Sequence, residues 1–305
     1  YDIIEVGHFV LDQIPAKELR SGDVGYLLGS IRDVSHILPG DTITTKVEPA
    51  IKPLEGFKEI KPMVFSGLYP SDTDDYDQLR VALEKLKLND ASLLFEPETS
   101  EALGFGFRCG FLGLLHMEII QERLEREFDL GLVTTTPNVR YQVLLKNNSI
   151  IEVDTPAKMP SSGDIQKISE PIVSAEIITP KEYIGAIMTL CQKKRGIYKT
   201  TNYISTDKAQ LHYDLPLAEI IFDFYDKLKS TTRGYASLDY HLKAFMKSDL
   251  KKLDILINND PVDALSIITH SEDAYNRGVA LCSKLKELIP RQMFDVPIQA
   301  SLGRK

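Results

Sequence analysis

The chain has 305 residues, of which 43% are hydrophobic and 26% charged, a balance typical of a globular protein with two or three domains. No apolar run approaches the roughly 20 residues that a membrane-spanning helix requires, and the first residues do not resemble a signal peptide. Three widely spaced cysteines without a C-x-x-C pair favour a reducing cytosol and argue against disulfides or zinc. Because the chain opens directly on a strand-like stretch without an initiator methionine, we expect it to be part of a longer protein.

The net charge of −8 is unevenly distributed along the sequence. Residues 1–150 carry 15 basic and 24 acidic side chains, whereas residues 151–305 carry 21 and 20. An acidic total argues against nucleic-acid binding, but the asymmetry leaves the C-terminal half as a place where RNA could bind.

Residues 1–52 have the pattern of short β-strands. Turn signals at 21–23 and 39–41 flank strands predicted at 24–29 and 42–48. Three or four strands are too few to close a barrel, so we predict the second half of a β-barrel.

The next part of the chain predicts a ferredoxin-like βαββαβ unit. Its expected elements are a strand at 61–69, a helix that begins at the acidic residues 71–75, strands at 92–97 and 104–110, a helix at 112–128 and a strand at 131–136. A hairpin over 139–154 and a linker over 155–169 are predicted to follow.

The same order of elements is predicted a second time. A strand at 172–178 leads into a helix whose start combines a capping box with a proline at Thr179, Pro180 and Glu182, and whose natural end is Gly196. Strands at 198–205 and 209–214, a helix at 216–232 and a strand at 235–244 complete this unit. Strands at 253–257, 263–269 and 294–300, with a helix capped by Ser271, form the last part. The predicted fold class is therefore α+β, with a partial β-barrel, two ferredoxin-like βαββαβ domains and the start of a further domain.

Isolated reactive residues favour structural roles. His116 lies in an apolar helix pattern without a second ligand at helical spacing, so we expect a packed, hydrogen-bonded histidine rather than a catalytic one. Cys109, near a predicted helix start, is expected to be a small buried side chain rather than a reactive thiol. The glycines at 104, 106, 110 and 113 lack phosphate-loop spacing and indicate close packing of strand against helix, and the aspartates at 72, 74, 75 and 77 indicate helix capping rather than a metal site.

Basic residues gather at helix ends in the second half and are the candidate RNA contacts. Two interpretations stay open, since cations also stabilise helix C-termini through the helix dipole, while phosphate binding requires lysine and arginine. The candidates are Lys193, Lys194, Arg195, Lys199, Lys227, Lys229, Arg233, Lys247, Lys251 and Lys252.

Several long stretches closely resemble translational GTPases of the LepA (elongation factor 4) family, namely residues 61–70, 88–93, 104–118, 170–172, 179–185, 215–219, 232–237, 261–265 and 288–292. The resemblance implies the tail of β-barrel domain II over 1–52, ferredoxin-like domain III with the following hairpin over 53–154 and a linker over 155–169. It implies ferredoxin-like domain V over 170–247 and the start of the C-terminal domain over 248–305. Elongation factor G is disfavoured because there is no room between the two units for its fourth domain, and the BipA-type factors do not match residues 250–300.

This resemblance implies the ribosome-docking portion of a GTP-dependent back-translocase or fidelity and assembly factor. The chain holds no G-x-x-x-x-G-K-[ST] or N-K-x-D motif, so we expect it to be no enzyme and to bind no cofactor, with GTP and Mg²⁺ held by a domain outside it. Implied partners are large-subunit ribosomal RNA near the stalk base and the sarcin–ricin loop, and tRNA through the C-terminal domain, without DNA and without an integral membrane segment. The implied location is the cytoplasm, with the parent peripheral on the inner face of the cell membrane as a further option. The alternatives are an organellar homologue of the same family and a self-contained α+β protein that binds a small ligand.

Overall fold

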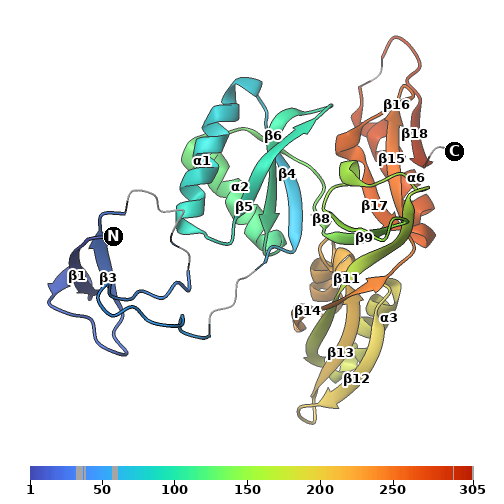
Figure 1. The fold of residues 1–305 in the computed structure, drawn as a ribbon. Coiled ribbons are helices and arrows are strands. Elements are labelled where there is room, and N and C mark those ends of the chain that lie inside the picture. Colours follow the sequence, from blue (N-terminus) through green and yellow to red (C-terminus); the bar gives the residue numbers. More distant parts are fainter. Residues whose placement is uncertain (32–36, 38, 57–60, 291, 304–305) are drawn as a thin grey trace. The chain divides into compact units, whose positions relative to one another are not determined.

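The computed structural model describes residues 1–305 except 32–36, 38, 57–60, 291 and 304–305 (Figure 1). The chain divides into two compact units, Tyr1–Glu59 and Ile60–Lys305. Several antiparallel sheets with helices make up the fold, which is of the mixed α+β class.

The first unit is an open three-stranded antiparallel sheet. Its strands are β1 (Ile3–Phe9), β2 (Gln13–Ala16) and β3 (Gly25–Gly29), in the order β2-β1-β3. The strand predicted at 24–29 is confirmed as β3, whereas the one predicted at 42–48 is wrong. There the Thr44 and Thr45 hydroxyls bond to the backbone of Glu48 and Ala50, and such local bonds compete with strand pairing.

The second unit begins with a sheet in the order β5-β6-β4-β7, which is the strand order of a βαββαβ unit. Its elements are β4 (Val64–Pro70), the short 3₁₀ helix η2 (Thr73–Asp75), α1 (Tyr76–Asn89), β5 (Leu94–Ser100), β6 (Gly104–Phe111), α2 (Leu114–Phe128), β7 (Leu132–Thr134) and β8 (Asn138–Val139). Helices α1 and α2 lie on one face of the sheet (Figure 1). Their apolar residues recur at helical spacing and supply buried Leu79, Leu83 and Ile120.

A second set of strands has the equivalent order β14-β11-β13-β12. Its elements are β11 (Ile165–Pro180), η4 (Lys181–Tyr183), α3 (Ile184–Lys193), β12 (Ile197–Tyr203), β13 (Lys208–Pro216), α4 (Leu217–Ile220), α5 (Phe224–Thr231) and β14 (Ser237–Lys247). The single helix predicted over 216–232 is two helices. The break falls at 221–223, where the Asp223 carboxylate turns towards Lys194 and Lys227.

The hairpin of β9 (Tyr141–Leu145) and β10 (Ile150–Val153) belongs to the sheet that contains β11, called the second sheet below. It does not belong to the sheet of β5, β6, β4 and β7, called the first sheet below. Strand β9 pairs with the first residues of β11, Ile165 to Ser169, so part of the predicted linker over 155–169 is strand. The remainder contains η3 (Pro156–Lys158). The apolar residues of this segment, Ile165 and Ile168, are three positions apart because the register shifts between Ile165 and Lys167, so the sequence does not show the alternation of a regular strand.

The boundaries of α3 differ from prediction at both ends. Thr179 lies in β11 with a buried hydroxyl that has no partner among the described residues, so no capping box forms. At the other end Arg195, not Gly196, takes the left-handed conformation, with φ of 57°, and the Gly196 amide then donates to the Cys191 carbonyl at 2.8 Å.

The last part is a small sheet covered by one helix. Its elements are β15 (Leu250–Ile257), β16 (Asp260–Pro261), η5 (Asp263–Leu265), β17 (Ile267–His270), α6 (Ser271–Leu288) and β18 (Ile298–Leu302), with β15 paired to the other three strands. The predicted helix cap was one residue late, since the His270 ring rather than Ser271 accepts from the Glu272 amide. Gly278 lets α6 approach Ala300 of β18, where an added Cβ would come within 3.0 Å.

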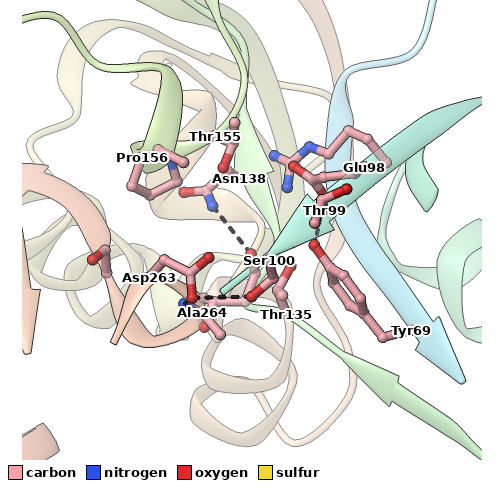
Figure 2. Close-up of a pocket in the computed structure, with 14 residues that line it drawn as sticks. Tyr69, Glu98, Thr99, Ser100, Thr135, Asn138, Thr155, Pro156, Asp263 and Ala264 are labelled. Carbon is pink, nitrogen blue, oxygen red and sulfur yellow. Dashed lines mark hydrogen bonds between the residues drawn. The ribbon is translucent and has the colours of Figure 1, made fainter. Parts of the chain in front are cut away.

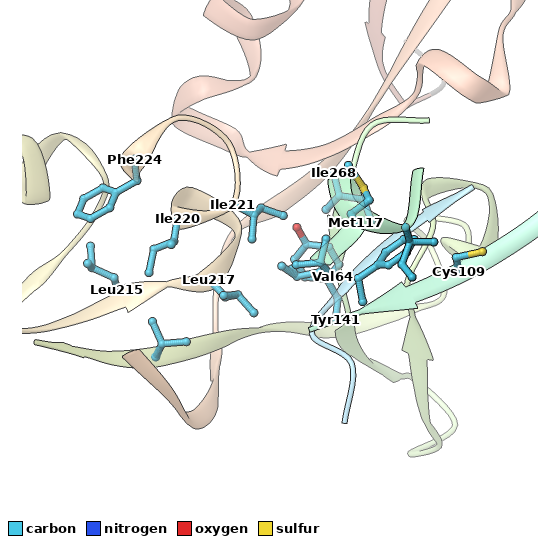
Figure 3. Packing of buried hydrophobic residues seen from close by; sticks show 14 of the residues in the cluster. Val64, Cys109, Met117, Tyr141, Leu215, Leu217, Ile220, Ile221, Phe224 and Ile268 are labelled. Atoms are coloured by element: carbon cyan, nitrogen blue, oxygen red, sulfur yellow. The ribbon is translucent and has the colours of Figure 1, made fainter. Parts of the chain in front are cut away.

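One apolar cluster connects these parts of the second unit. It includes Val64 and Cys109 of the first sheet, Tyr141 of the hairpin, Phe224 of α5 and Ile268 of β17 (Figure 3). Each fully buried side chain of this size contributes about 1.5–3 kcal/mol. The charged residues discussed next are therefore displayed on a well-packed scaffold.

Candidate RNA-binding surface

The ten basic residues predicted to contact RNA differ in whether their side chains already form ion pairs with carboxylates. Lys194 and Arg195, at the end of α3, belong to a part-buried ion-pair network. Arg195 donates to both oxygens of Glu170 at 2.7 and 3.0 Å and to Glu219 at 3.2 Å, while Lys194 bonds to Asp223 at 2.6 Å. Glu170 and Glu219 are only 3% and 4% exposed, so these cations neutralise buried charge.

Arg277 of α6 completes this network at 3.4 Å from Glu219. The network therefore ties α3, α4 and β11 to the last part of the chain. Glu170, Glu219 and Arg277 were not predicted from the sequence as members of a site. Glu219 follows Leu217 in a largely apolar stretch, and a lone acid among apolar residues was the available signal for a buried ion pair.

Lys199 is engaged differently, on the open face of the second sheet. Its ammonium lies 2.9 Å from the Asp214 carboxylate, which also accepts from Lys243 at 2.8 Å. Burial alone would raise the pKa of Asp214, but the hydrogen bonds and charges of the two lysines outweigh it and hold that pKa below its ordinary value.

Four further candidates have local partners at the surface. Lys227 pairs with Asp223, Lys251 with Asp249 at 3.6 Å and Lys252 with Asp254 at 3.1 Å. Lys229 donates to the Gly234 carbonyl at 3.3 Å and lies over the Tyr225 ring. Such exposed pairs contribute little to stability and exchange readily for a phosphate.

Lys193, Arg233 and Lys247 are exposed and, within the part of the chain that the structure describes, have no hydrogen bond or ion pair from their side chains. Lys193 and Lys247 lie at the same end of the second sheet, because Arg195 also bonds Ser248 at 3.4 Å. Arg233 lies at the end of α5. RNA contact by any of the ten residues stays a prediction, but these three are the cations most available for it.

The other residues weighed in the sequence have structural roles. The His116 ring lies 2.8 Å from Asp90 and accepts from the Leu112 amide at 3.0 Å, so the expected packed, hydrogen-bonded histidine is confirmed. Cys109 is fully buried in β6, not at a helix start, and burial raises the pKa of its thiol. Asp72 caps η2 by accepting from the Asp74 amide, as predicted for this cluster. A Cβ at Gly106 would meet the Leu68 carbonyl at 2.5 Å, so the close packing here is between the neighbouring strands β6 and β4, and the predicted packing of strand against helix is wrong at this glycine.

A polar cavity of about 30 Å³ lies where the first sheet meets the segment around η3 and η5 (Figure 2). Asp263 accepts from the Ser100 hydroxyl at 2.9 Å and the Glu101 amide at 3.0 Å. Arg108, 4% exposed, donates to the Asp154 carbonyl, and its Nε has no partner among the described residues. Burial lowers the pKa of this guanidinium despite the nearby carboxylates of Glu98 and Asp154. The volume suits about one or two water molecules rather than a substrate.

No group of three or more His, Cys, Asp or Glu side chains that could hold a metal ion occurs among the described residues. Over the same residues, no helix is both long and apolar enough to cross a membrane.

Comparison with known proteins gives two family matches and many close relatives. Residues 167–256 match the elongation factor G C-terminus, and residues 257–305 match the C-terminus of the GTP-binding protein LepA. The chain is 56% identical over all 305 residues to elongation factor 4 of Phocaeicola vulgatus and 55% identical over 305 residues to that of Chlorobium limicola. It covers 51% and 50% of these proteins, so it spans about half the length of the curated relatives it matches.

Proposed function

Because the chain belongs to the LepA (elongation factor 4) family, we propose that it is the ribosome-docking portion of such a translation factor. The observation that carries this proposal is the 56% identity to elongation factor 4 across the whole chain. In this proposal the partner is the ribosome, through large-subunit RNA near the stalk base and the sarcin–ricin loop, with tRNA contacted through the last part of the chain.

The proposed domain assignment follows the family. Residues 1–52 would be the tail of β-barrel domain II, and the two βαββαβ units would be ferredoxin-like domains III and V. The match to LepA over 257–305 supports a C-terminal domain beginning near residue 248. The pairing of β9 with β11 supports assigning the hairpin to domain V rather than to domain III.

The chemistry of the parent is proposed to lie outside this chain. A GTP-hydrolysing domain would bind GTP and Mg²⁺ and act in the cytoplasm in back-translocation, fidelity or ribosome assembly. The 305 residues contain no phosphate-binding loop, so this chain alone is expected to neither bind nor hydrolyse GTP.

Co-sedimentation with 50S subunits across a potassium chloride titration tests the docking role. We expect the chain to pellet at low salt and to be released as salt rises, because counterions compete for phosphate. The double variant Lys193→Glu, Arg233→Glu should weaken pelleting about tenfold or more, since it reverses two unpaired cations.

The matched control is Lys17→Glu, Lys46→Glu in the first unit, which makes the same charge change at two exposed lysines. Lys194 and Arg195 are unsuitable probes because their loss would leave Glu219 and Glu170 short of partners. A chain that remains in the supernatant at every salt concentration would show that it does not dock by itself.

A further inference from the structure

An open groove of about 490 Å³ lies between the first residues of β11 and the turn that joins β14 to β15. Its polar walls are Gln166, Lys167, Lys247, Ser248, Asp249 and Lys251. Lys167 was not among the residues singled out from the sequence, because it lies in the stretch interpreted as a linker.

The groove is strongly biased towards positive charge. Three lysines face one carboxylate, and Asp249 is itself held by the Ser271 hydroxyl and by Lys251 at 3.6 Å. Lys167 and Lys247 are exposed and have no side-chain partner within the described residues. In the register of β14 against β11, Lys247 lies opposite Ser169. Because Ser169 is two residues after Lys167 and on the same face of the sheet, the two lysines are diagonal neighbours whose backbones lie about 7–8 Å apart.

The backbone on one side of the groove is an open strand edge, and the other side is held in place by a hydrogen bond to the buried ion-pair network. Strand β14 stops pairing at Lys247. Beyond that point the edge of β11 opposite β9 is bonded only through the Ser248 amide and the Ile168 carbonyl, among the residues described here. A register shift between Ile165 and Lys167 marks a bulge at Gln166, a device that redirects side chains. Arg195 bonds the Ser248 hydroxyl from within the buried network, which fixes the other wall.

We propose that this groove takes up the phosphodiester backbone of ribosomal RNA when the chain docks, an inference that rests on the proposed function. Its lining combines the ammonium groups of the three lysines with the hydroxyls of Ser162 and Ser248 and the open edge of β11, and such donors bind phosphate. Among the described residues, no aromatic side chain on which a base could stack lines the groove, so the contact is with the RNA backbone and is independent of base sequence.

The test is the triple variant Lys167→Gln, Lys247→Gln, Lys251→Gln of the full chain, measured against wild type by 50S co-sedimentation over a potassium chloride titration. Each phosphate contact contributes about 0.7–0.9 to the slope of log affinity against log salt. Loss of three contacts should therefore lower the slope by about 2–3. Anisotropy with a fluorescein-labelled ribosomal RNA hairpin provides a second readout that does not require the intact subunit.

Lys17→Gln, Lys46→Gln, Lys52→Gln is the control, with the same change in net charge at exposed lysines of the first unit. The single variants Lys167→Gln and Lys247→Gln should each lower the slope by about 1 and, being exposed and unpaired, should fold like wild type. Circular dichroism checks that they do.

The outcomes separate the two proposals. If wild type pellets and the triple variant keeps its slope, or loses no more than the control, the groove proposal is wrong while docking stands. If wild type never pellets, docking by this chain fails. In that case the groove proposal is also wrong if the labelled RNA hairpin binds the triple variant and wild type with equal affinity.

Discussion

Arg195 combines an unfavourable backbone conformation with a part-buried guanidinium. A left-handed φ of 57° costs a non-glycine residue roughly 1–2 kcal/mol, and the following glycine does not take over that position. The conformation brings the guanidinium between Glu170 and Glu219, two carboxylates almost without solvent contact. Ion pairing at this residue therefore outweighs backbone preference, which explains why a sequence pattern with Gly196 as the helix stop was one residue out.

Replacing Arg195 by methionine should lower the free energy of unfolding by about 2–4 kcal/mol, because Glu170 would be left buried and without a cation. Denaturant unfolding measures the change. Lys193→Met, two residues earlier and exposed, is the control and should change stability by no more than about 0.5 kcal/mol. A loss for Arg195→Met as small as that of the control would mean that the network is not a stabilising element.

At the scale of elements, two β-bulges each orient a lysine towards the carboxylate of Asp214. The register of β12 against β13 shifts between Tyr198 and Thr200, and that of β14 against β11 shifts opposite Ile172 and Val173. The extra residues at these shifts are Lys199 and Lys243, and both bond Asp214 of β13. One buried carboxylate thereby connects three strands, β12, β13 and β14, and Lys243 reaches Asp214 across β11.

Asp214→Asn should destabilise the protein near neutral pH and much less in acid. The folded-state pKa of Asp214 lies below its ordinary value of 3.8, so the stabilisation is present above that value and is lost as pH falls through the folded pKa. Denaturant unfolding of wild type and variant between neutral pH and about pH 3 checks this, with the difference expected to shrink below about pH 4. A difference that stays constant over this range would contradict the ion-pair explanation.

The type of an element could be predicted from the sequence where one of its faces is apolar. The prediction failed where side chains form hydrogen bonds to the backbone that replace those of a helix or strand. The spacing of Leu79, Leu83 and Leu86 predicted α1, and alternation predicted β13. Threonines 44 and 45 read as strand formers but bond their own loop. Lysine-rich helix ends predicted a basic surface, yet sequence cannot show that Lys194 and Arg195 face buried acids more than 20 residues away.

For the whole molecule, the two units differ in how much apolar surface they bury. In the described part of Tyr1–Glu59 the buried apolar side chain is Tyr26, while Ile4, Val10 and Leu11 are exposed by 72% or more. A three-stranded sheet with so little core is only marginally stable by itself. Ile60–Lys305, in contrast, contains the continuous cluster that begins at Val64.

Removing residues 1–59 should therefore leave the thermal unfolding of the remainder almost unchanged, with a melting temperature within about 2–4 °C of the full chain. In the full chain, hydrogen exchange should be fast for amides in β1, β2 and β3 and slow for those in β11 and β13. A large fall in melting temperature on truncation would show that the second unit depends on the first.

The junction between β8 and β9 has a mechanical consequence. Strand β8 ends at Val139 in the first sheet and β9 begins at Tyr141 in the second, with Arg140 alone between them. Arg140 is itself fixed, over the Phe65 ring at 4.5 Å and to Glu152 at 3.0 Å. Because a single residue links the two strands, a force on one sheet reaches the other directly through the backbone of Arg140. A displacement of either βαββαβ unit would then be transmitted to its neighbour, because no flexible loop lies between β8 and β9 to absorb it.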